Sequence, residues 1–381
     1  VKRIWHEVGW VEEGNDRHIE AMRGFIAESR GLVAVLDDEP EAFGHWTPGT
    51  FWYVDRPLTM CAVTAITTSR IARKQGFASA LTSRCLLEGR EAGFAVAALG
   101  IFDQGFYDRF GFGSGSYEHR FSLDPASLTV DVPYRAPIRL GADDYKEIHR
   151  VMTHRFRAHG SCTLDPVAVV KSELKWLDNP FGLGYRDENG QLTHFVFGTA
   201  KGEQGPYTLQ WWGYETKEQF LELLRLVKEL SDQVASVVIW EPPGIQVQDF
   251  IDRPFRQRTR TIKSDHETSH RAAAFWQMRI LDLDQCIEAR VWNGPELRFH
   301  LALTDPIASI EPGVDLTGDY VITLGEASGV EAGTGDGLPT LTASVNAFSR
   351  MWMGVRTPST LAVSDDLDGP PELMQALDEA F

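Results

Sequence analysis

Two short segments of the chain carry the side chains that could do chemistry. The first runs Arg73-Lys74-Gln75-Gly76-Phe77-Ala78-Ser79, with two cations ahead of a glycine and small residues. A helix that begins at Gly76 would present unpaired N–H groups and the positive end of its dipole, which together bind a phosphate or pyrophosphate. The second segment, residues 106–113, reads FYDRFGFG. Only Tyr107 among its aromatic side chains has a titratable hydroxyl, which makes it a candidate general acid.

The elements around these segments would hold them close together. An apolar strand pattern from Leu58 to Thr67 precedes the first segment, the helix after it is predicted to stop near Gly93, and a second apolar run covers Phe94 to Ile101. Strand, loop, helix and strand are the context that a phosphate cradle needs. At the end of the first strand, backbone groups of Ile66, Thr67 and Thr68 are expected to pair with an extended ligand and to polarise a carbonyl.

These motifs resemble those of a known superfamily. The segment Arg73–Ala78 is similar to the coenzyme A motif Q/R-x-x-G-x-G/A of the GNAT N-acetyltransferases. The segment Phe106–Gly113 resembles the signature Y-x-R-F-G-F/Y-G of the enhanced intracellular survival (Eis) acetyltransferases. The resemblance covers nearly the whole chain in organisation, and in sequence it is strong from about Val63 to Tyr117.

The resemblance implies an activity and a set of site residues. The cosubstrate would be acetyl-CoA, and the acceptor would be the primary amine of a cationic small molecule or peptide. Tyr107 would protonate the departing thiolate. Residues expected at the cofactor are Ile66, Thr67, Thr68, Arg73, Lys74, Gln75, Gly76, Phe77, Ala78 and Ser79, together with Phe102 and Asp103 just after the second strand. A homo-oligomer, specifically a hexamer, is also implied by the resemblance alone.

The resemblance also implies a general base. In the Eis family it is the C-terminal carboxylate, often of a phenylalanine, and this sequence ends in Phe381. The final residues, 376–381, look like a segment that precedes a further tail in the family. Either the tail is shorter here or it is absent from this sequence, so the assignment to Phe381 is conditional.

The chain is long enough for several domains. A length of 381 residues, with 43% hydrophobic residues, predicts two or three folded domains. The expected fold is α/β and α+β: an acetyl-CoA-binding domain over residues 1–130, a second acetyltransferase-like domain over 138–270, and a domain similar to sterol carrier proteins over 275–381. The first boundary is predicted at Asp131–Pro137, where two prolines discourage helix and central strand.

The second domain repeats the strand–helix–strand logic of the first. Its turn, Tyr214–Glu218, has no glycine and carries two carboxylates where phosphates would dock. We therefore expect it not to bind coenzyme A. In the third domain, strands are predicted at Leu297–Leu303 and Tyr320–Leu324, and helices at Thr342–Met353 and Pro371–Ala380.

Composition excludes some classes of function. The net charge is −17, and from Leu281 onward there are 17 acidic residues against four arginines and no lysine. This acidity disfavours nucleic-acid binding; it indicates either a solubilising surface or a field that attracts cationic amines. No apolar run reaches the roughly 18 residues of a membrane span. The four scattered cysteines are expected to be buried thiols, which favours a cytoplasmic location.

Two further patterns are weaker. His266-Glu267-Thr268-Ser269-His270 matches the zinc-protease pattern H-E-x-x-H, but its polar neighbours favour a linker, and no metal site is predicted. Trp211 and Trp212 could line an amine pocket, although adjacent strand residues face opposite sides and at least one should be packing.

Two alternatives to an acetyltransferase stay open at this point. The chain could be a non-catalytic carrier of an apolar ligand, or a regulatory protein that keeps coenzyme A only as a ligand. A carrier would need neither the cradle nor Tyr107. A regulatory protein would need the cradle to bind coenzyme A, but it would not need the Tyr107 phenol.

Overall fold

The computed structural model describes residues 1–100 and 105–381, and it divides into two compact units. Unit 1 combines residues 1–13, 29–116 and 274–381, and unit 2 combines residues 14–28 and 117–273. Unit 1 therefore combines the N-terminal and C-terminal regions of the chain, and unit 2 consists of two segments that lie between them in the sequence. None of the helices in the described part of the chain is long and apolar enough to cross a membrane.

The first sheet of unit 1 includes a strand from the far end of the chain. Its order is β1-β2-β3-β4-β14-β5, with bounds Arg30–Leu36, Glu39–Tyr53, Arg56–Thr68, Val96–Gly100, Trp276–Ile280 and Gly113–Ser114. Strand β14 pairs antiparallel with both β4 and β5. The predicted boundary at residue 275 thus falls just before a strand that completes the first sheet.

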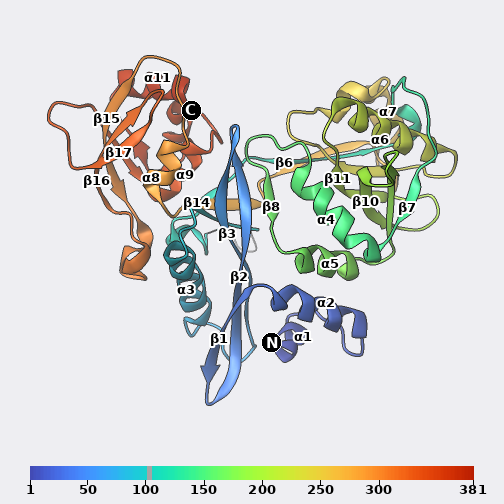
Figure 1. Cartoon of the computed structure of the whole chain (residues 1–381), viewed down its shortest axis with the longest axis horizontal. Helices are drawn as coiled ribbons and strands as arrows, with labels where there is room; N and C mark the ends of the chain where they lie inside the picture. Colours follow the sequence, from blue (N-terminus) through green and yellow to red (C-terminus); the bar gives the residue numbers. More distant parts are fainter. Residues whose placement is uncertain (101–104) are drawn as a thin grey trace. The chain divides into compact units, whose positions relative to one another are not determined.

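Helix α3 (Phe77–Glu91) crosses from β3 to β4 and packs on β2 and β3 (Figure 1). The helix lies close to the sheet: a Cβ on Gly89 would stand 2.8 Å from the Cys61 sulfur. The core beneath it contains Val63, Cys85 and Leu86, all buried. Helix α1 (Lys2–Glu7) contacts β2 and β3.

The C-terminal part of unit 1 holds a second, smaller sheet (Figure 1). Its order is β17-β16-β15-β18-β19, with bounds Gly329–Ala332, Gly318–Leu324, Leu297–Thr304, Thr340–Ser344 and Leu367–Asp368. The accompanying helices are α8 (Leu283–Glu288), α9 (Val345–Trp352), α10 (Pro358–Leu361) and α11 (Pro371–Ala380). The helix predicted from Thr342 begins only at Val345, because Thr340–Ser344 forms β18 and the Ser344 side chain caps α9.

Unit 2 is built on one mixed sheet. Its order is β13-β6-β12-β11-β10-β9-β7, with bounds Ser269–Ala273, Glu118–Leu123, Val237–Trp240, Tyr207–Gly213, Leu192–Ala200, Pro180–Arg186 and Ile138–Leu140. Its helices are α2 (Asp16–Ala27), α4 (Tyr145–His154), α5 (Val167–Trp176), α6 (Lys217–Glu229) and α7 (Pro254–Thr261). The residues of β6 lie within the predicted bounds of the first domain, and in the structure they belong to this sheet.

Unit 2 repeats the parallel crossover of unit 1. Strands β11 and β12 pair in parallel with α6 between them, as β3 and β4 do around α3. The buried core of this half includes Leu209, Leu223 and Ile239. Of the cysteines, Cys61, Cys85 and Cys286 are buried as predicted, whereas Cys162 is exposed.

Candidate functional site

The strand β3 bends away from β4 where the predicted ligand site begins. Parallel pairing of the two strands covers Met60–Ala62, and β3 then continues to Thr68 without a further partner on β4 among the described residues. Opposite Gly44 the register with β2 shifts by one residue, and Ala65 has φ +54°, so β3 carries a bulge there. Bulges bend a strand and re-aim its backbone groups. The Ile66–Thr68 stretch predicted to bind ligand begins within this bulge, since Ala65 and Ile66 together lie opposite Gly44.

Helix α3 begins as an anion-binding N-terminus should. Its N-cap is Gly76 with φ +86°, and no side chain in the described residues caps the first turn. Lys74 also has positive φ (+62°), and both Arg73 and Lys74 are exposed. A Cβ on Gly76 would have nothing within 4 Å, so the approach to these N–H groups is open. Uncapped N–H groups and two cations in one turn fit a pyrophosphate.

One carboxylate comes near the start of this loop. Glu7 accepts a hydrogen bond from the Arg70 N–H at 2.8 Å, and Arg3 donates to the same carboxylate at 3.1 Å. The negative charge is therefore paired before the cationic turn begins. The Gln75 side chain donates back to the Ile71 carbonyl at 2.9 Å, which steadies the loop.

Tyr107 sits at the start of a short 3-10 helix, Asp108–Phe110, and is 8% exposed. Its ring makes edge contacts with Phe106 and Phe112, at centroid distances of 4.9 and 6.1 Å. It belongs to the same buried cluster as Val63 of β3 and Cys85 of α3. As predicted, the phenylalanines are packing residues, and Phe110 and Phe112 are almost fully buried.

Arg109 connects the Tyr107 segment to the cradle. Its guanidinium donates to the Ser79 hydroxyl at 2.7 Å and lies over the Phe106 ring, 4.3 Å from the centroid. Ser79 stands in the first turn of α3. The arginine of the signature thus joins the candidate acid to the candidate phosphate site.

Residues from the C-terminal region hold this segment from the other side. Asn346 of α9 donates to the backbone carbonyls of Asp108 and Phe112, at 2.7 and 2.8 Å. Arg279 of β14 donates to the Phe110 carbonyl at 2.5 Å. Gly111 has φ +81°, and a Cβ there would lie 2.7 Å from an Arg279 nitrogen.

The sequence had given no sign of these supports. Arg279 and Asn346 lie far from the signature in the chain, and no local pattern marks either of them. Only the pairing of β14 with β4 and β5 brings Arg279 under the signature.

Arg279 is fully buried and paired. Its other terminal nitrogen donates to Asp305 at 2.8 Å and to the Val314 carbonyl at 3.2 Å. Both side chains of the ion pair are 0% exposed. Burial lowers the pKa of Arg279 from its usual value, and Asp305 opposes that shift.

Phe381 lies in the C-terminal part of unit 1. Arg290 donates to the Ala380 carbonyl at 2.7 Å, and its guanidinium lies 5.6 Å from the Phe381 ring centroid. The Phe381 N–H donates to the Leu377 carbonyl, which continues α11. These contacts place the Phe381 ring beside Arg290.

The corresponding turn of unit 2 is closed to an anion. The Thr216 side chain accepts from the Gln219 N–H at 3.3 Å, while the Gln219 side chain accepts from Glu215 and Thr216 at 2.7 and 3.4 Å. This capping box occupies the N–H groups that a phosphate would use. The side chains of Thr216 and Gln219 therefore add a second reason, beside the carboxylates, why this copy should not bind coenzyme A.

The other sequence patterns have structural places. Of the H-E-x-x-H residues, His266 lies in a turn after α7 and His270 lies on β13, so the two histidines do not share a helix face. Trp212 packs in the core with Phe220, whereas Trp211 packs against Phe197 on the other face. Both tryptophans are packing residues.

Most of the predicted cofactor residues lie at the end of β3, in the loop that follows it and in the first turn of α3. Those that the structure describes are Ile66, Thr67, Thr68, Arg73, Lys74, Gln75, Gly76, Phe77, Ala78 and Ser79. Phe102 and Asp103 lie outside the described residues.

Comparisons with known proteins agree with this architecture. A family model described as a sterol carrier protein domain matches residues 283–381. An uncharacterized N-acetyltransferase from Streptomyces avermitilis is 23% identical over 348 residues, which are 83% of this chain and 77% of that protein.

Solved structures resemble the chain along its whole length. A probable N-acyltransferase from Enterococcus faecalis V583 has a TM-score of 0.80 at 17% identity, and covers 99% of this chain and 92% of its own. A GCN5-related N-acetyltransferase from Kribbella flavida has a TM-score of 0.76 at 19% identity, with 99% and 91% covered. Eis1 from Mycobacterium abscessus has a TM-score of 0.75 at 14% identity, with 99% and 92% covered.

These likenesses establish the fold. The predicted fold class is confirmed: acetyltransferase-like tandem domains are followed by a sterol-carrier-like domain. The predicted resemblance is confirmed as well, since the chain has the fold of the GNAT N-acetyltransferases, Eis1 among them.

Proposed function

We propose that the chain is an acyl-CoA-dependent N-acetyltransferase that moves an acetyl group from acetyl-CoA to a primary amine. One observation carries this proposal: the uncapped N-terminus of α3 is joined, through Arg109 and Ser79, to the segment that presents Tyr107. A protein that only bound coenzyme A, without catalysing a reaction, would not need a phenol beside the cofactor site. The likeness to N-acetyltransferases supports the same class of reaction.

The residues of the cradle fit the cosubstrate. Arg73, Lys74 and the N–H groups that follow Gly76 would hold the pyrophosphate. The backbone of β3 after its bulge, Ile66–Thr68, would pair with the extended arm and polarise the acetyl carbonyl. Phe102 and Asp103 stay a prediction.

Tyr107 is the proposed general acid. The acceptor amine attacks the thioester carbonyl, the carbon–sulfur bond breaks, and the sulfur leaves as a thiolate. The Tyr107 hydroxyl gives its proton to that thiolate, since the reference pKa of about 10 is within reach of a thiol's. The acceptor ammonium must lose a proton before it attacks, and the base expected at Phe381 for this step stays a prediction. The Tyr107 phenolate that remains regains a proton from solvent.

The acceptor is proposed to be cationic. An amine near neutral pH is protonated, and the net charge of −17 favours the approach of cations over anions. A homo-oligomer, specifically a hexamer, and a cytoplasmic location stay predictions. Light scattering on the purified chain would measure the first.

A thiol-release assay with acetyl-CoA tests the proposal. It would be run against polyamines, aminoglycosides and amino-terminal peptides, with acetylated product identified by mass. Tyr107→Phe is expected to lower kcat by roughly 100-fold or more and to leave the KM for acetyl-CoA near that of the wild type, since an acid acts in the transition state.

The matched control is Tyr134→Phe, at a half-exposed tyrosine of the linker outside the site. It should leave kcat unchanged. Unaltered turnover in Tyr107→Phe would rule out the phenol as the acid. Failure of the wild type to release thiol with any amine, together with binding of an apolar ligand, would favour the carrier alternative.

A further inference from the structure

Three side chains that commonly bind metals meet on one face of the unit 2 sheet, outside the proposed acetyl-transfer site. His119 lies on β6, His270 lies on β13, and Glu241 follows the last residue of β12. The ligand atoms of all three lie within 4.8 Å of one another. We propose that His119, Glu241 and His270 form a binding site for a divalent transition metal of the Zn²⁺ class.

The register of the sheet puts these side chains together. His270 pairs with Phe121 across β13 and β6, so His119, two residues earlier on β6, is its diagonal neighbour on the same face. Trp240 pairs with Arg120 across β12 and β6, and the Glu241 N–H donates to the His119 carbonyl at 2.9 Å. Glu241 therefore continues the register opposite His119. Strands β6 and β13 and the residue that follows β12 each supply one ligand.

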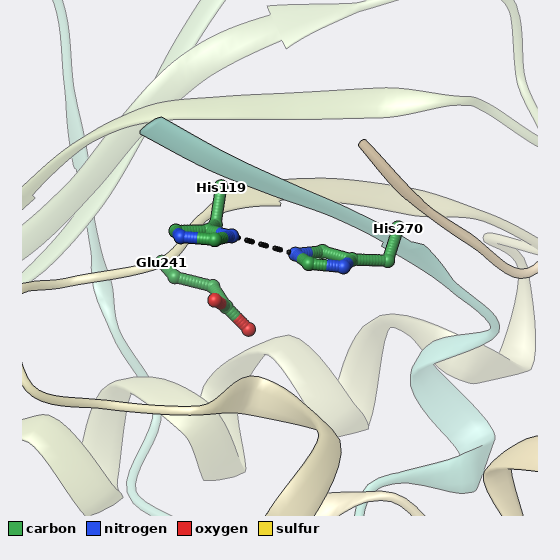
Figure 2. A group of neighbouring side chains, drawn as sticks. All are labelled: His119, Glu241 and His270. Carbon is green, nitrogen blue, oxygen red and sulfur yellow. Dashed lines mark hydrogen bonds between the residues drawn. The ribbon is translucent and has the colours of Figure 1, made fainter. Parts of the chain in front are cut away.

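The distance between the imidazoles suits a shared ion. His119 Nδ1 and His270 Nε2 are 3.0 Å apart, in rings 5.0 Å apart by centroid and 6° from parallel. Figure 2 shows the two rings joined by this hydrogen bond and the Glu241 side chain beside them. Two nitrogens at the usual zinc distance stand about 2.9 Å apart at a right angle and about 3.3 Å at the tetrahedral angle. The separation of the two nitrogens therefore lies in the range of two ligands of one ion.

Neighbouring groups orient one ligand, and the nearby arginine side chains lie on the opposite face of the sheet. One oxygen of Glu241 accepts from the Val247 N–H at 2.9 Å, which is the kind of outer contact that orients a ligating carboxylate. Arg120 and Arg271 pair with each other and lie on the opposite face, because strand side chains alternate. On that face Arg120 stacks over Trp240 at 4.3 Å.

The donor set indicates which class of metal fits the site. Two imidazoles and one carboxylate suit Zn²⁺, Co²⁺ and related ions better than Ca²⁺ or Mg²⁺, which prefer oxygen. His119 and Glu241 are half-buried and His270 is exposed, so the site opens to solvent and leaves a coordination position for water. A bound ion would fasten the edge strand β13 to β6 and β12. This role differs from the H-E-x-x-H interpretation, in which His266 and His270 share a helix.

Isothermal titration of the full chain with ZnCl₂ tests the site, with His119→Gln, His270→Gln and Glu241→Gln as variants. Each is expected to weaken Zn²⁺ binding by at least about 10-fold, the scale at which ligand-shell changes act. The matched control is His154→Gln, at an exposed histidine of α4 that should leave the affinity unchanged. At a hundredfold excess over the Kd, Zn²⁺ should raise the wild-type Tm by roughly 3 to 8 °C.

A second readout separates this site from the exposed thiol. Co²⁺ bound by nitrogen and oxygen gives visible d–d bands without a thiolate charge-transfer band, and Cys162→Ser should leave that spectrum unchanged. Equal Zn²⁺ affinity in the wild type and the His119→Gln and His270→Gln variants would overturn the proposal. So would a cobalt spectrum that shows thiolate ligation and disappears in Cys162→Ser.

Discussion

The buried ion pair beneath the signature gives the sharpest test of how the site is held. In Arg279→Met, the Asp305 carboxylate loses its cation in a place where both side chains are 0% exposed. The Phe110 and Val314 carbonyls lose their donor in the same step. Removing one partner of a buried pair costs about 3–5 kcal/mol, because the other charge stays desolvated. In a unit of about 200 residues this corresponds to a fall in Tm of roughly 6 to 20 °C.

Calorimetry and urea unfolding would measure this loss. Arg298→Met, at an exposed arginine of β15, is the matched control and should stay within about 0.5 kcal/mol of the wild type. The double variant Arg279→Met/Asp305→Asn should recover part of the stability, because no charge is left buried. The single amide oxygen can still accept from one of the N–H groups of Ile307 and Leu316, which bond to different oxygens of Asp305. A cost below about 1 kcal/mol for Arg279→Met, or a double variant less stable than Arg279→Met, would refute the reasoning.

Three other changes probe separate parts of the chain. Gly111→Ala should destabilise the chain by at least about 1–2 kcal/mol in urea unfolding, because φ is +81° there and the new Cβ meets Arg279. Thr216→Ala should cost about 1 kcal/mol by the same measurement and leave the KM for acetyl-CoA unchanged, since it removes a helix cap in the copy that we expect not to bind coenzyme A. Burial raises the pKa of Glu173 to about 7, above the value of about 4.3 in an unfolded chain. Its contribution to stability is therefore complete below about pH 4 and is lost as pH rises through 7. The free energy of unfolding should fall between pH 5 and pH 8 in the wild type, and it should fall less in Glu173→Gln.

Local pattern was enough to predict the elements that carry the cradle. The strand predicted at 58–67 is β3, the helix from Gly76 is α3, and the run after Phe94 contains β4. In each, apolar periodicity and a glycine at the turn act within a few residues, so tertiary contacts are not needed to recognise them. The same holds for α11, whose predicted bounds agree with the structure.

Strand β2 was not predicted, although the two strands it pairs with, β1 and β3, are its neighbours in the chain. Strand β2 contains Pro40 and Pro48, which argue against a central strand, yet it pairs with both β1 and β3. Pairing with two neighbours and a buried face outweigh the missing N–H groups. The N-cap Ser344 could have corrected the start of α9, since a serine three residues before a bonded N–H is a helix-start signal.

The placement of β14 adds a strand from the C-terminal region to the sheet that lies beside the candidate acid. Its five residues pair with β4 and β5, and Arg279 within it supports the carbonyl three residues after Tyr107. Asn346 of α9, in the sterol-carrier-like part, fixes two further carbonyls of the same segment. The candidate acid is therefore positioned by residues that follow the whole of unit 2 in the chain. The motif from Arg73 to Gly113 predicts the chemistry, and residues of the C-terminal region hold the backbone of the segment that carries the candidate acid.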